Sequence, residues 1–452
     1  MGSPHRYIPN TEHDVAKMLG AIGHSSIDEL FADIPASARL TRPLALPRAM
    51  TEPELMAELS RLSSQCANAN DFACYLGGGV YDHYCPTAID HILRRSEFYT
   101  AYTPYQPEVS QGTLQAIFEY QTMITELTAM DVANASMYDA GSAMAEAAIM
   151  ACSATKRSTV MVARTVNPAY RKVLNTYANG RGIKVVEVGF CSKRGVTSGS
   201  RLSEIGFDDV ACLIVQSPNY FGVVEDMPRL ASAVHEAGGL FVSVVNPISL
   251  GLLTPPGEYG ADIAIGDGQP MGLPMSFGGP LLGFFATTSK LLRKMPGRLV
   301  GQTVDGAGRR GFVLTLQARE QHIRRENATS NICSNQALCA LAATIYLSLM
   351  GPTGLRTVAE LSTYRAHYLH ERIGEVLGFR TPFTGPFFNE FVIESQRDPA
   401  EINEELLDAG IIGGKPLDVD YPELSGHSLW AVTEMRTREQ LDALVRELEV
   451  LA

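Results

Sequence analysis

The residues best suited to chemistry lie in an irregular segment, YTAYTPYQPEVSQGTLQAIFEYQTM, which occupies positions 99–123. Pro104 and Pro107 keep its first half out of a helix, because proline disfavours helix at its own position and at the residue before it. Hydroxyl, amide and carboxylate groups gather in this half and are able to line a polar cleft. The candidate catalytic residues are Tyr102, Thr103, Tyr105, Gln106 and Glu108. The alternative is a crossing or interface loop whose tyrosines only pack.

A helix beginning at Ser110 is predicted to anchor this loop. Apolar residues follow at three- and four-residue steps, which is the spacing of one helix face. They are Leu114, Ile117, Phe118, Ile124 and Leu127. One end of the loop is therefore expected to be fixed against a core.

Length, charge and cysteine content narrow the class of protein. A chain of 452 residues predicts two or three domains, and a net charge of -12 argues against a nucleic acid or an anionic membrane as partner. The 8 cysteines include no CxxC pair and no metal-ligand spacing, so we expect free thiols and no metal site. We find no apolar run long enough to span a bilayer and no signal-peptide pattern. These features predict a soluble, cytoplasmic protein.

Residues 1–98 are predicted to form an N-terminal helical arm. Thr51 and Glu54 make a capping box at one helix start, and another helix is predicted to begin at Pro86. The consecutive glycines 77–79 allow a tight backbone path, but they are a weak phosphate-loop signal because no strand and helix frame them. We interpret His83, in the same segment, as structural rather than catalytic.

Residues 99–335 are predicted to form a large α/β domain. Short apolar runs alternate here with helical stretches, which is the pattern of a mostly parallel sheet with helical crossovers. The runs are Thr159 to Ala163, Ile183 to Val188, Ala211 to Val215, Leu240 to Val245, Asp262 to Ile265 and Leu281 to Ala286.

Residues 336–452 are predicted to form C-terminal helices and a small α+β domain. Ser334 is expected to cap an apolar helix that stops at Gly351-Pro352. Strands are expected at 387–393 and 428–433, with helices after each of them.

Two further features are suited to binding anions. A turn of small residues at Gly141 and Ser142 leads into a helix, whose N–H groups and serine hydroxyl are able to hold an anion; close packing is the alternative. Arg319, Arg324 and Arg325 are able to bind a carboxylate, and a solvated basic face is the alternative.

Two long motifs resemble one protein family. The run YLGGGVYDHYCP at 75–86 and the run YTAYTPYQPEVSQGTLQAIFEYQTMITELTAMDVANASMYD from position 99 are similar to the P-protein of the glycine cleavage system. The resemblance extends from about residue 6 to residue 452. It implies the α/β fold of type I pyridoxal-phosphate-dependent transferases, with the Gly141-Ser142 turn in the region of the cofactor phosphate. It also implies that the arginine-rich segment lies near a subunit interface and the active cleft.

Two residues that this fold uses to hold its cofactor are missing at the corresponding positions. An acid that pairs with the pyridine nitrogen is replaced by Asn246, and the lysine that binds the cofactor covalently is replaced by Gln269-Pro270. No lysine occurs between Lys193 and Lys290. The resemblance therefore implies the two-chain form of the P-protein, with pyridoxal 5'-phosphate on the partner and not on this chain. The alternative is that Lys290 or Lys415 holds it.

The resemblance also implies an activity and a set of partners. The implied enzyme, a glycine dehydrogenase, decarboxylates glycine and transfers the aminomethyl group to the lipoyl group of the H-protein. The implied partners are subunit 2, in a heterotetramer with two copies of each chain, the lipoylated H-protein and glycine. This chain is expected to supply cleft walls and partner contacts. The alternatives are a non-catalytic scaffold or regulatory subunit, and an autonomous pyridoxal-phosphate lyase, which the missing lysine disfavours.

Overall fold

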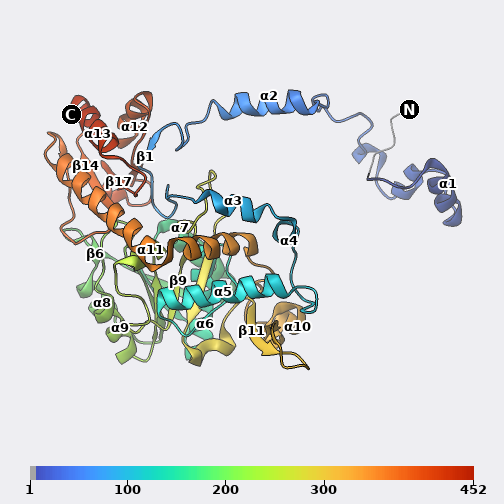
Figure 1. The fold of residues 1–452 in the computed structure, drawn as a ribbon, viewed down its shortest axis with the longest axis horizontal. Helices are drawn as coiled ribbons and strands as arrows, with labels where there is room; N and C mark the ends of the chain where they lie inside the picture. Colours follow the sequence, from blue (N-terminus) through green and yellow to red (C-terminus); the bar gives the residue numbers. More distant parts are fainter. Residues whose placement is uncertain (1–6) are drawn as a thin grey trace. The chain divides into compact units, whose positions relative to one another are not determined.

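The apolar runs predicted as strands lie in one seven-stranded sheet of the computed structural model, which describes residues 7–452 (Figure 1). In spatial order the strands are β2 (Val132–Ala133), β10 (Gly283–Thr287), β9 (Ile263–Asp267), β8 (Leu240–Val244), β7 (Val210–Gln216), β3 (Thr159–Ala163) and β4 (Lys184–Val188). The strands from β9 to β4 are parallel, whereas β10 pairs antiparallel with both β9 and β2. The prediction of a large, mostly parallel sheet is confirmed.

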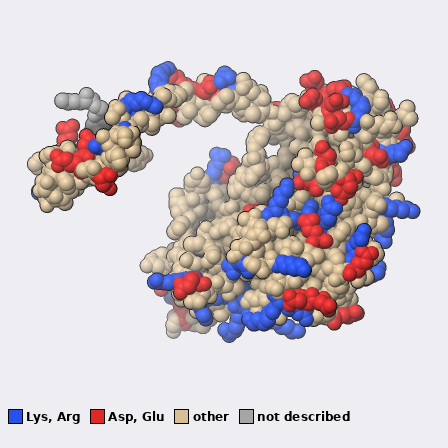
Figure 2. Space-filling view, turned by 180° about the vertical axis from the view of Figure 1, so that it is seen from behind, with Lys and Arg blue, Asp and Glu red and all other residues tan. Residues whose placement is uncertain are grey.

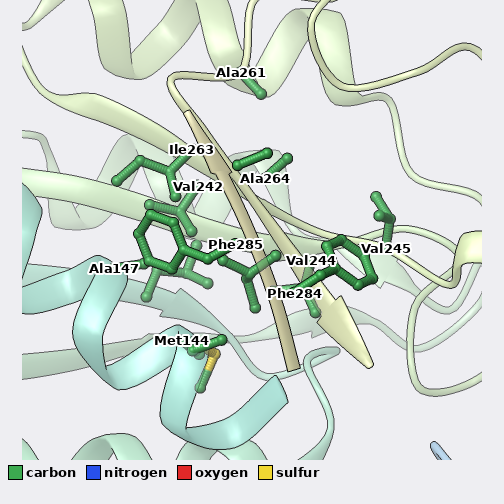
Figure 3. Packing of buried hydrophobic residues seen from close by; sticks show 14 of the residues in the cluster. Met144, Ala147, Val242, Val244, Val245, Ala261, Ile263, Ala264, Phe284 and Phe285 are labelled. Atoms are coloured by element: carbon green, nitrogen blue, oxygen red, sulfur yellow. The ribbon is translucent and has the colours of Figure 1, made fainter. Parts of the chain in front are cut away.

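Helix α6 (Ala140–Thr155) forms much of the packing against this sheet. Its first twelve residues, through Ala151, are all buried, and most of them are small, so the helix approaches the strands closely. Figure 3 shows Met144 and Ala147 of α6 among the sheet residues Val244 and Phe285. The helix N-terminus therefore lies inside the domain, at the end of the sheet where β9 ends.

The remaining helices of this region are α3 (Thr87–Leu93), α4 (Ser96–Tyr99), α5 (Gln111–Thr128), α7 (Pro168–Arg181), α8 (Gly199–Ile205) and α9 (Met227–Glu236), with the 3-10 helices η3 (Pro247–Gly251) and η4 (Ser289–Lys294) and the hairpin β5 (Phe190–Cys191) and β6 (Val196–Thr197). Of these helices, α7, α8 and α9 lie between strands, as the crossovers of a parallel sheet require, whereas α3, α4 and α5 follow one another before β2. Helix α5 follows Ser110, as predicted, and buries Leu114, Ile117 and Ile124.

A hairpin that sequence patterning did not identify lies beside α5. Strands β11 (Leu299–Val304) and β12 (Arg310–Thr315) pair antiparallel, and Gln111 ties the start of α5 to Phe312 by two hydrogen bonds of 2.9 Å. An irregular segment follows with short helices η5 (Gln317–Arg319), α10 (Gln321–Arg324) and η6 (Arg325–Asn327). The hairpin and this segment form one side of the candidate site described below.

Helix α11 (Ala337–Gly374) consists of two helices joined at a kink. Gly351 has φ 58° and ψ -176° at the break, and Pro352 follows it, as predicted from the Gly-Pro pair. The predicted cap at Ser334 was wrong, because the residue before the helix is Gln336 and no side chain caps it. By length and composition α11 is apolar enough to cross a membrane, which was not expected; half of that apolar window is buried inside the molecule.

The C-terminal part forms the small α+β layer that was predicted. Its antiparallel sheet contains β13 (Phe379–Arg380), β14 (Glu390–Ser395), β17 (His427–Ala431) and β16 (Lys415–Pro416) in that order. Helices α12 (Pro399–Asp408) and α13 (Arg438–Leu451) accompany it, with η7 (Pro422–Leu424). Strand β1 (Ala73–Cys74) pairs parallel with β15 (Ile411–Ile412). Residues just after position 70 thus belong to the same packed region as the C-terminus.

The chain divides into two compact units at Cys66 and Ala67. The first unit contains α1 (Glu12–Ala21), η1 (Ile27–Phe31), η2 (Ala36–Ala38) and α2 (Glu52–Ser63). The capping box of Thr51 and Glu54 is present, yet α2 buries none of its residues. The second unit contains everything from Ala67 onwards, so the arm predicted for residues 1–98 spans the division.

Charges of both signs are mixed on the face of the molecule seen in Figure 2, where Lys and Arg lie among Asp and Glu. On this face, acidic residues interrupt the basic ones, whereas binding to a phosphate backbone relies on clustered Lys and Arg.

Candidate functional site

The five candidate residues of the loop lie mainly at the surface. Tyr102 is 86% exposed and Tyr105 is 46% exposed, while Gln106 and Glu108 are also exposed and Thr103 is half-buried. Pro104 is buried and fixes the loop to the body of the domain. Within this chain the polar side chains therefore do not close around a ligand. They form a surface that a second molecule can complete.

A cavity of about 310 Å³ lies behind the loop. Its wall brings together the loop, one face of α5 and the residues that lead into α11. The lining residues are Phe98, Tyr99, Ala101, Tyr102, Thr103, Pro104, Thr113, Ala116, Ile117, Arg298, Ser334, Asn335, Gln336, Ala337, Leu338, Ala340 and Leu341. Of the predicted residues, Tyr102 and Thr103 share this cavity, whereas Tyr105, Gln106 and Glu108 do not line it.

Tyr105 does not line the cavity itself but contacts Arg298, which does. Arg298 Nη2 donates a hydrogen bond of 3.1 Å to the Tyr105 hydroxyl, and the guanidinium lies 5.4 Å from the centre of the tyrosine ring. The His322 ring meets the same tyrosine edge-on at 5.8 Å. Glu320 lies 3.8 Å from Arg298, and both side chains are only 7% exposed. Neither Arg298 nor Glu320 was predicted from the sequence. The one signal for Arg298 is its place directly before the apolar residues Leu299 and Val300, where a charged side chain is expected to lie next to a buried strand.

Two of the three arginines predicted to bind a carboxylate, Arg319 and Arg324, donate to backbone carbonyls, and Arg325 is exposed. Arg319 donates to the carbonyl of Met295 and, at 2.7 Å, to that of Gly297. Arg324 donates to the carbonyl of Ala318 at 3.2 Å. Arg319 thus supports the backbone that carries Arg298.

At the end of β9, the position expected for a cofactor-binding lysine holds a buried amide. Gln269 is fully buried, and its Oε1 accepts a 2.9 Å hydrogen bond from the backbone N–H of Tyr81. Its Nε2 donates to the carbonyls of Tyr81 at 3.0 Å and of Leu273 at 2.7 Å. Two of these hydrogen bonds hold Tyr81 of the 75–86 segment against the end of β9, and the third closes the turn to Leu273.

A buried carboxylate closes the same region from the C-terminal layer. Glu390 of β14 accepts hydrogen bonds from the backbone N–H of Gly78 at 2.7 Å and from the Tyr81 hydroxyl at 2.8 Å. A Cβ at Gly77 would lie 2.2 Å from Glu390 Oε1, so only glycine permits this approach. Burial raises the pKa of Glu390 to about 7, although the hydrogen bonds from Gly78 and Tyr81 and, to a smaller extent, the charge of Lys415 oppose the shift. The triple glycine thus accommodates a protein carboxylate.

The turn at Gly141 and Ser142 is also occupied by protein groups. Asp139 Oδ1 accepts the N–H of Ser142 at 2.7 Å, and Asp267 Oδ2 accepts the N–H of Ala140 at 3.3 Å. Burial raises the pKa of Asp267 to about 6. A phosphate at this helix N-terminus would have to displace carboxylates that already hold its donors.

The other groups considered for cofactor binding are engaged or distant. Asn246 Oδ1 accepts from the N–H of Ile248 at 3.0 Å and so caps η3. Lys415 donates to the Tyr220 hydroxyl at 2.6 Å, and Lys290 is exposed in η4. His83 is buried and pairs with Glu434 at 2.7 Å, as a structural histidine would. Among residues 7–452, no group of three or more His, Cys, Asp or Glu is placed to hold a metal ion.

Comparison with known proteins identifies the family. The model of the family described as glycine cleavage system P-protein matches residues 5–448. The chain belongs to the glycine cleavage system P-protein family. A relative from Geobacillus thermodenitrificans (strain NG80-2), described as a probable glycine dehydrogenase (decarboxylating) subunit 1, is 56% identical over 444 residues, covering 98% of each chain. A relative with the same description from Bacillus cereus (strain B4264) is 55% identical and covers 98% of this chain and 99% of its own.

Solved structures agree with this assignment to the P-protein family. A crystal structure of glycine decarboxylase (P-protein) of the glycine cleavage system, in inhibitor-bound form, matches with a TM-score of 0.90 and 46% identity over 99% of this chain and 100% of that one. A sphingosine-1-phosphate lyase from Burkholderia pseudomallei matches with a TM-score of 0.65 at 13% identity, over 92% of this chain and 93% of its own. The latter shows the fold alone, which is that of type I pyridoxal-phosphate-dependent enzymes.

The residues of this P-protein chain do not fit a covalently bound pyridoxal phosphate. Gln269 stands where the resemblance to that fold implies the lysine, and it is hydrogen-bonded to Tyr81, which Glu390 also holds together with Gly78. Pyridoxal phosphate belongs to the fold, but this chain offers it no lysine at that position.

Proposed function

We propose that this chain is subunit 1 of the decarboxylating glycine dehydrogenase and is active only together with a second, unlike subunit. Support comes from relatives so described, which match over nearly the full length of the chain. The reaction removes CO2 from glycine and transfers the remaining aminomethyl group to the lipoyl group of the H-protein. The observation that carries the proposal is Gln269, whose amide holds Tyr81 where a cofactor-binding lysine would be needed.

The proposal assigns pyridoxal phosphate to the partner subunit. The lysines of this chain support the assignment. Lys415 donates to the Tyr220 hydroxyl, and Lys290 lies on the surface. No lysine occurs between Lys193 and Lys290. When bound on the partner, the cofactor supplies the electron-withdrawing group that decarboxylation requires.

This chain's own contribution is the exposed surface of the 99–108 loop. Tyr102, Tyr105 and Glu108 present two phenol groups and a carboxylate to the outside of a segment that Pro104 fixes in place. Groups fixed in advance of binding lower the barrier by holding a substrate in a reactive geometry. We assign this surface to one wall of the partner's cleft, where it holds glycine.

The proposed assembly is a heterotetramer with two copies of each subunit, to which the lipoylated H-protein docks. Sites of this fold form across a dimer interface, and a permanent interface buries on the order of 2,000 Å² or more. Stable pairing with the second subunit therefore follows from the need to complete the cleft.

Mixing experiments test the proposal. The two subunits, purified apart, are combined at increasing molar ratios with the lipoylated H-protein, and glycine–bicarbonate exchange is measured alongside sedimentation. We expect each subunit alone to be inactive and exchange to reach its plateau at equal amounts, when the heterotetramer is fully formed. Full exchange by the second subunit alone would contradict the proposal and favour a scaffold role for this chain.

A further inference from the structure

Arg298 is a buried arginine, and among residues 7–452 the tyrosine hydroxyl of Tyr105 is the one side-chain acceptor at hydrogen-bond distance from it. Its Nη2 donates to Tyr105 at 3.1 Å, and its Nε has no hydrogen-bond partner among the described residues. The nearest carboxylate, Glu320, lies 3.8 Å away and leaves its own Oε1 unpartnered. Burying a charge pair with so few hydrogen bonds is unfavourable for stability. Proteins tolerate such locally unfavourable arrangements mainly at functional sites.

The backbone that carries Arg298 is held from several sides. The carbonyl of Arg298 accepts the N–H of Ala135 at 2.9 Å. Arg319 binds the carbonyls of Met295 and Gly297, and Asn134 Nδ2 donates to Pro296 at 3.1 Å. The guanidinium therefore projects from a fixed support, in contrast to an exposed arginine, which samples many conformations.

The direction of the Arg298–Tyr105 hydrogen bond determines what Tyr105 can offer. A guanidinium has five N–H donors and no acceptor, so the tyrosine oxygen must accept. The hydroxyl proton then remains for another molecule, and Tyr105 is 46% exposed. The ring is held as well, because the guanidinium lies over one face and His322 meets it edge-on.

We infer that Arg298, supported by Glu320, is a positioning residue that holds Tyr105 as a hydrogen-bond donor toward the glycine carboxylate in the partner's cleft. This inference rests on the proposed function and adds to it a residue that touches no substrate. A phenol already oriented by a cation donates without the reorganisation that a free tyrosine would need. Lysine is a poor substitute, because a point charge cannot both stack over the ring and reach the oxygen as the planar guanidinium does.

A double-mutant cycle in the assembled complex tests the inference. The variants are Arg298→Met, Tyr105→Phe and the two combined, each scored by kcat and KM for glycine in the exchange assay and by sedimentation. We expect Arg298→Met to lower kcat about as far as Tyr105→Phe, and the double variant to fall no further, because both remove one oriented donor. Arg298→Lys is expected to restore only part of the rate.

Arg310 provides a matched control, because its guanidinium lies 5.6 Å from the ring centre of Phe312, which has no hydroxyl. Arg310→Met is expected to leave kcat unchanged. If Arg298→Met prevents assembly, Glu320→Gln is used in its place. We expect Glu320→Gln to lower kcat severalfold, and to have no effect on kcat when Tyr105→Phe is already present.

The outcomes separate the inference from the proposed function. A lower rate in Tyr105→Phe with unchanged rates in assembled Arg298 and Glu320 variants overturns the inference and leaves the loop in the site. Additive losses at Arg298 and Tyr105 also overturn it, since the two residues would then act independently. An unchanged rate in Tyr105→Phe removes the loop from the site and overturns the proposed role of this chain as well.

Discussion

The side chain of Gln269, at the end of β9, has a structural role. Its amide accepts from the Tyr81 N–H and donates to two carbonyls, so it satisfies both kinds of backbone group. A lysine ammonium only donates and would leave the Tyr81 N–H unpaired. Gln269 therefore stabilises the 75–86 segment through Tyr81.

We predict that Gln269→Ala destabilises the isolated chain by on the order of 3 kcal/mol or more. The substitution leaves the Tyr81 N–H and the carbonyls of Tyr81 and Leu273 without partners, and each such buried group costs about 1–3 kcal/mol. Urea unfolding measures the change. Gln302→Ala, at an exposed position of β11, is the control and should stay within about 0.5 kcal/mol of the parent. Equal midpoints for the two variants would show that the amide is not structural.

The raised pKa of Glu390 predicts that the free energy of unfolding depends on pH. Its pKa is raised from 4.5 to about 7, so the folded state binds the proton more tightly than the unfolded state does. The stability that this carboxyl contributes is full below about pH 4.5 and is lost as the pH rises through about 7. Glu390→Gln removes the titrating group but keeps its shape.

The melting temperature of Glu390→Gln, relative to the parent, should therefore rise between pH 5 and pH 8 by a few degrees. Differential scanning calorimetry on the isolated chain measures it. Glu404→Gln, at an exposed position of α12, should show a difference that does not vary with pH. If the difference in melting temperature between Glu390→Gln and the parent does not change from pH 5 to pH 8, Glu390 is ionised in the folded chain throughout this range.

Among the elements, the loop at 99–108 joins a fixed support to an exposed polar surface. Pro104 is buried, and α5 begins directly after the loop with Gln111 tied to Phe312. Tyr102 of this loop is 86% exposed, and Tyr105 is 46% exposed. A rigid loop with exposed rings is suited to contact with a second subunit.

We predict that Glu108→Gln preserves the heterotetramer and lowers glycine–bicarbonate exchange, on the order of a hundredfold if the carboxylate contacts the reacting centre. The change removes a charge and keeps the size of the side chain, so packing at the interface should survive. Glu126→Gln, an exposed position on α5, is the matched control and should leave exchange unchanged. Intact tetramers with normal exchange in Glu108→Gln would exclude a catalytic role for this carboxylate.

Elements with strong local patterns could be predicted from the sequence, and elements made by distant contacts could not. The buried runs of β3, β7 and β8 and the break at Gly351 follow from apolar patterning and turn chemistry. The β11–β12 hairpin was missed, although its Asp305-Gly306 turn is a recognisable hairpin signal. Ser334 was predicted as a cap from residue type alone, but the helix begins three residues later.

For the candidate site, the sequence itself shows that no lysine lies between Lys193 and Lys290, and the role of the polar loop stays a prediction; the residues that support Gln269 and Tyr105 could not be predicted. Tyr81 and Glu390 are 309 residues apart, and Tyr105 and Arg298 are 193 residues apart. Contacts over such separations depend on the tertiary fold, so a single sequence gives no local signal for them.

At the scale of the whole molecule, the chain has the fold of a pyridoxal-phosphate enzyme without the means to bind the cofactor covalently at the usual position. Its central sheet, its α6 N-terminus and its C-terminal layer meet around Gln269 and Glu390, which join them through the 75–86 segment. Hydrogen bonds between the 75–86 segment and both Gln269 and Glu390 hold these parts together. Catalytic capacity is then expected only in a complex whose other chain carries the cofactor.

The most direct test is borohydride reduction of the reconstituted complex, followed by peptide mapping of both chains. Reduction fixes pyridoxal phosphate to the lysine that holds it. We predict that every phosphopyridoxyl peptide comes from the second subunit and none from this chain. A phosphopyridoxyl group on Lys415, Lys290 or any other lysine of this chain would contradict the account.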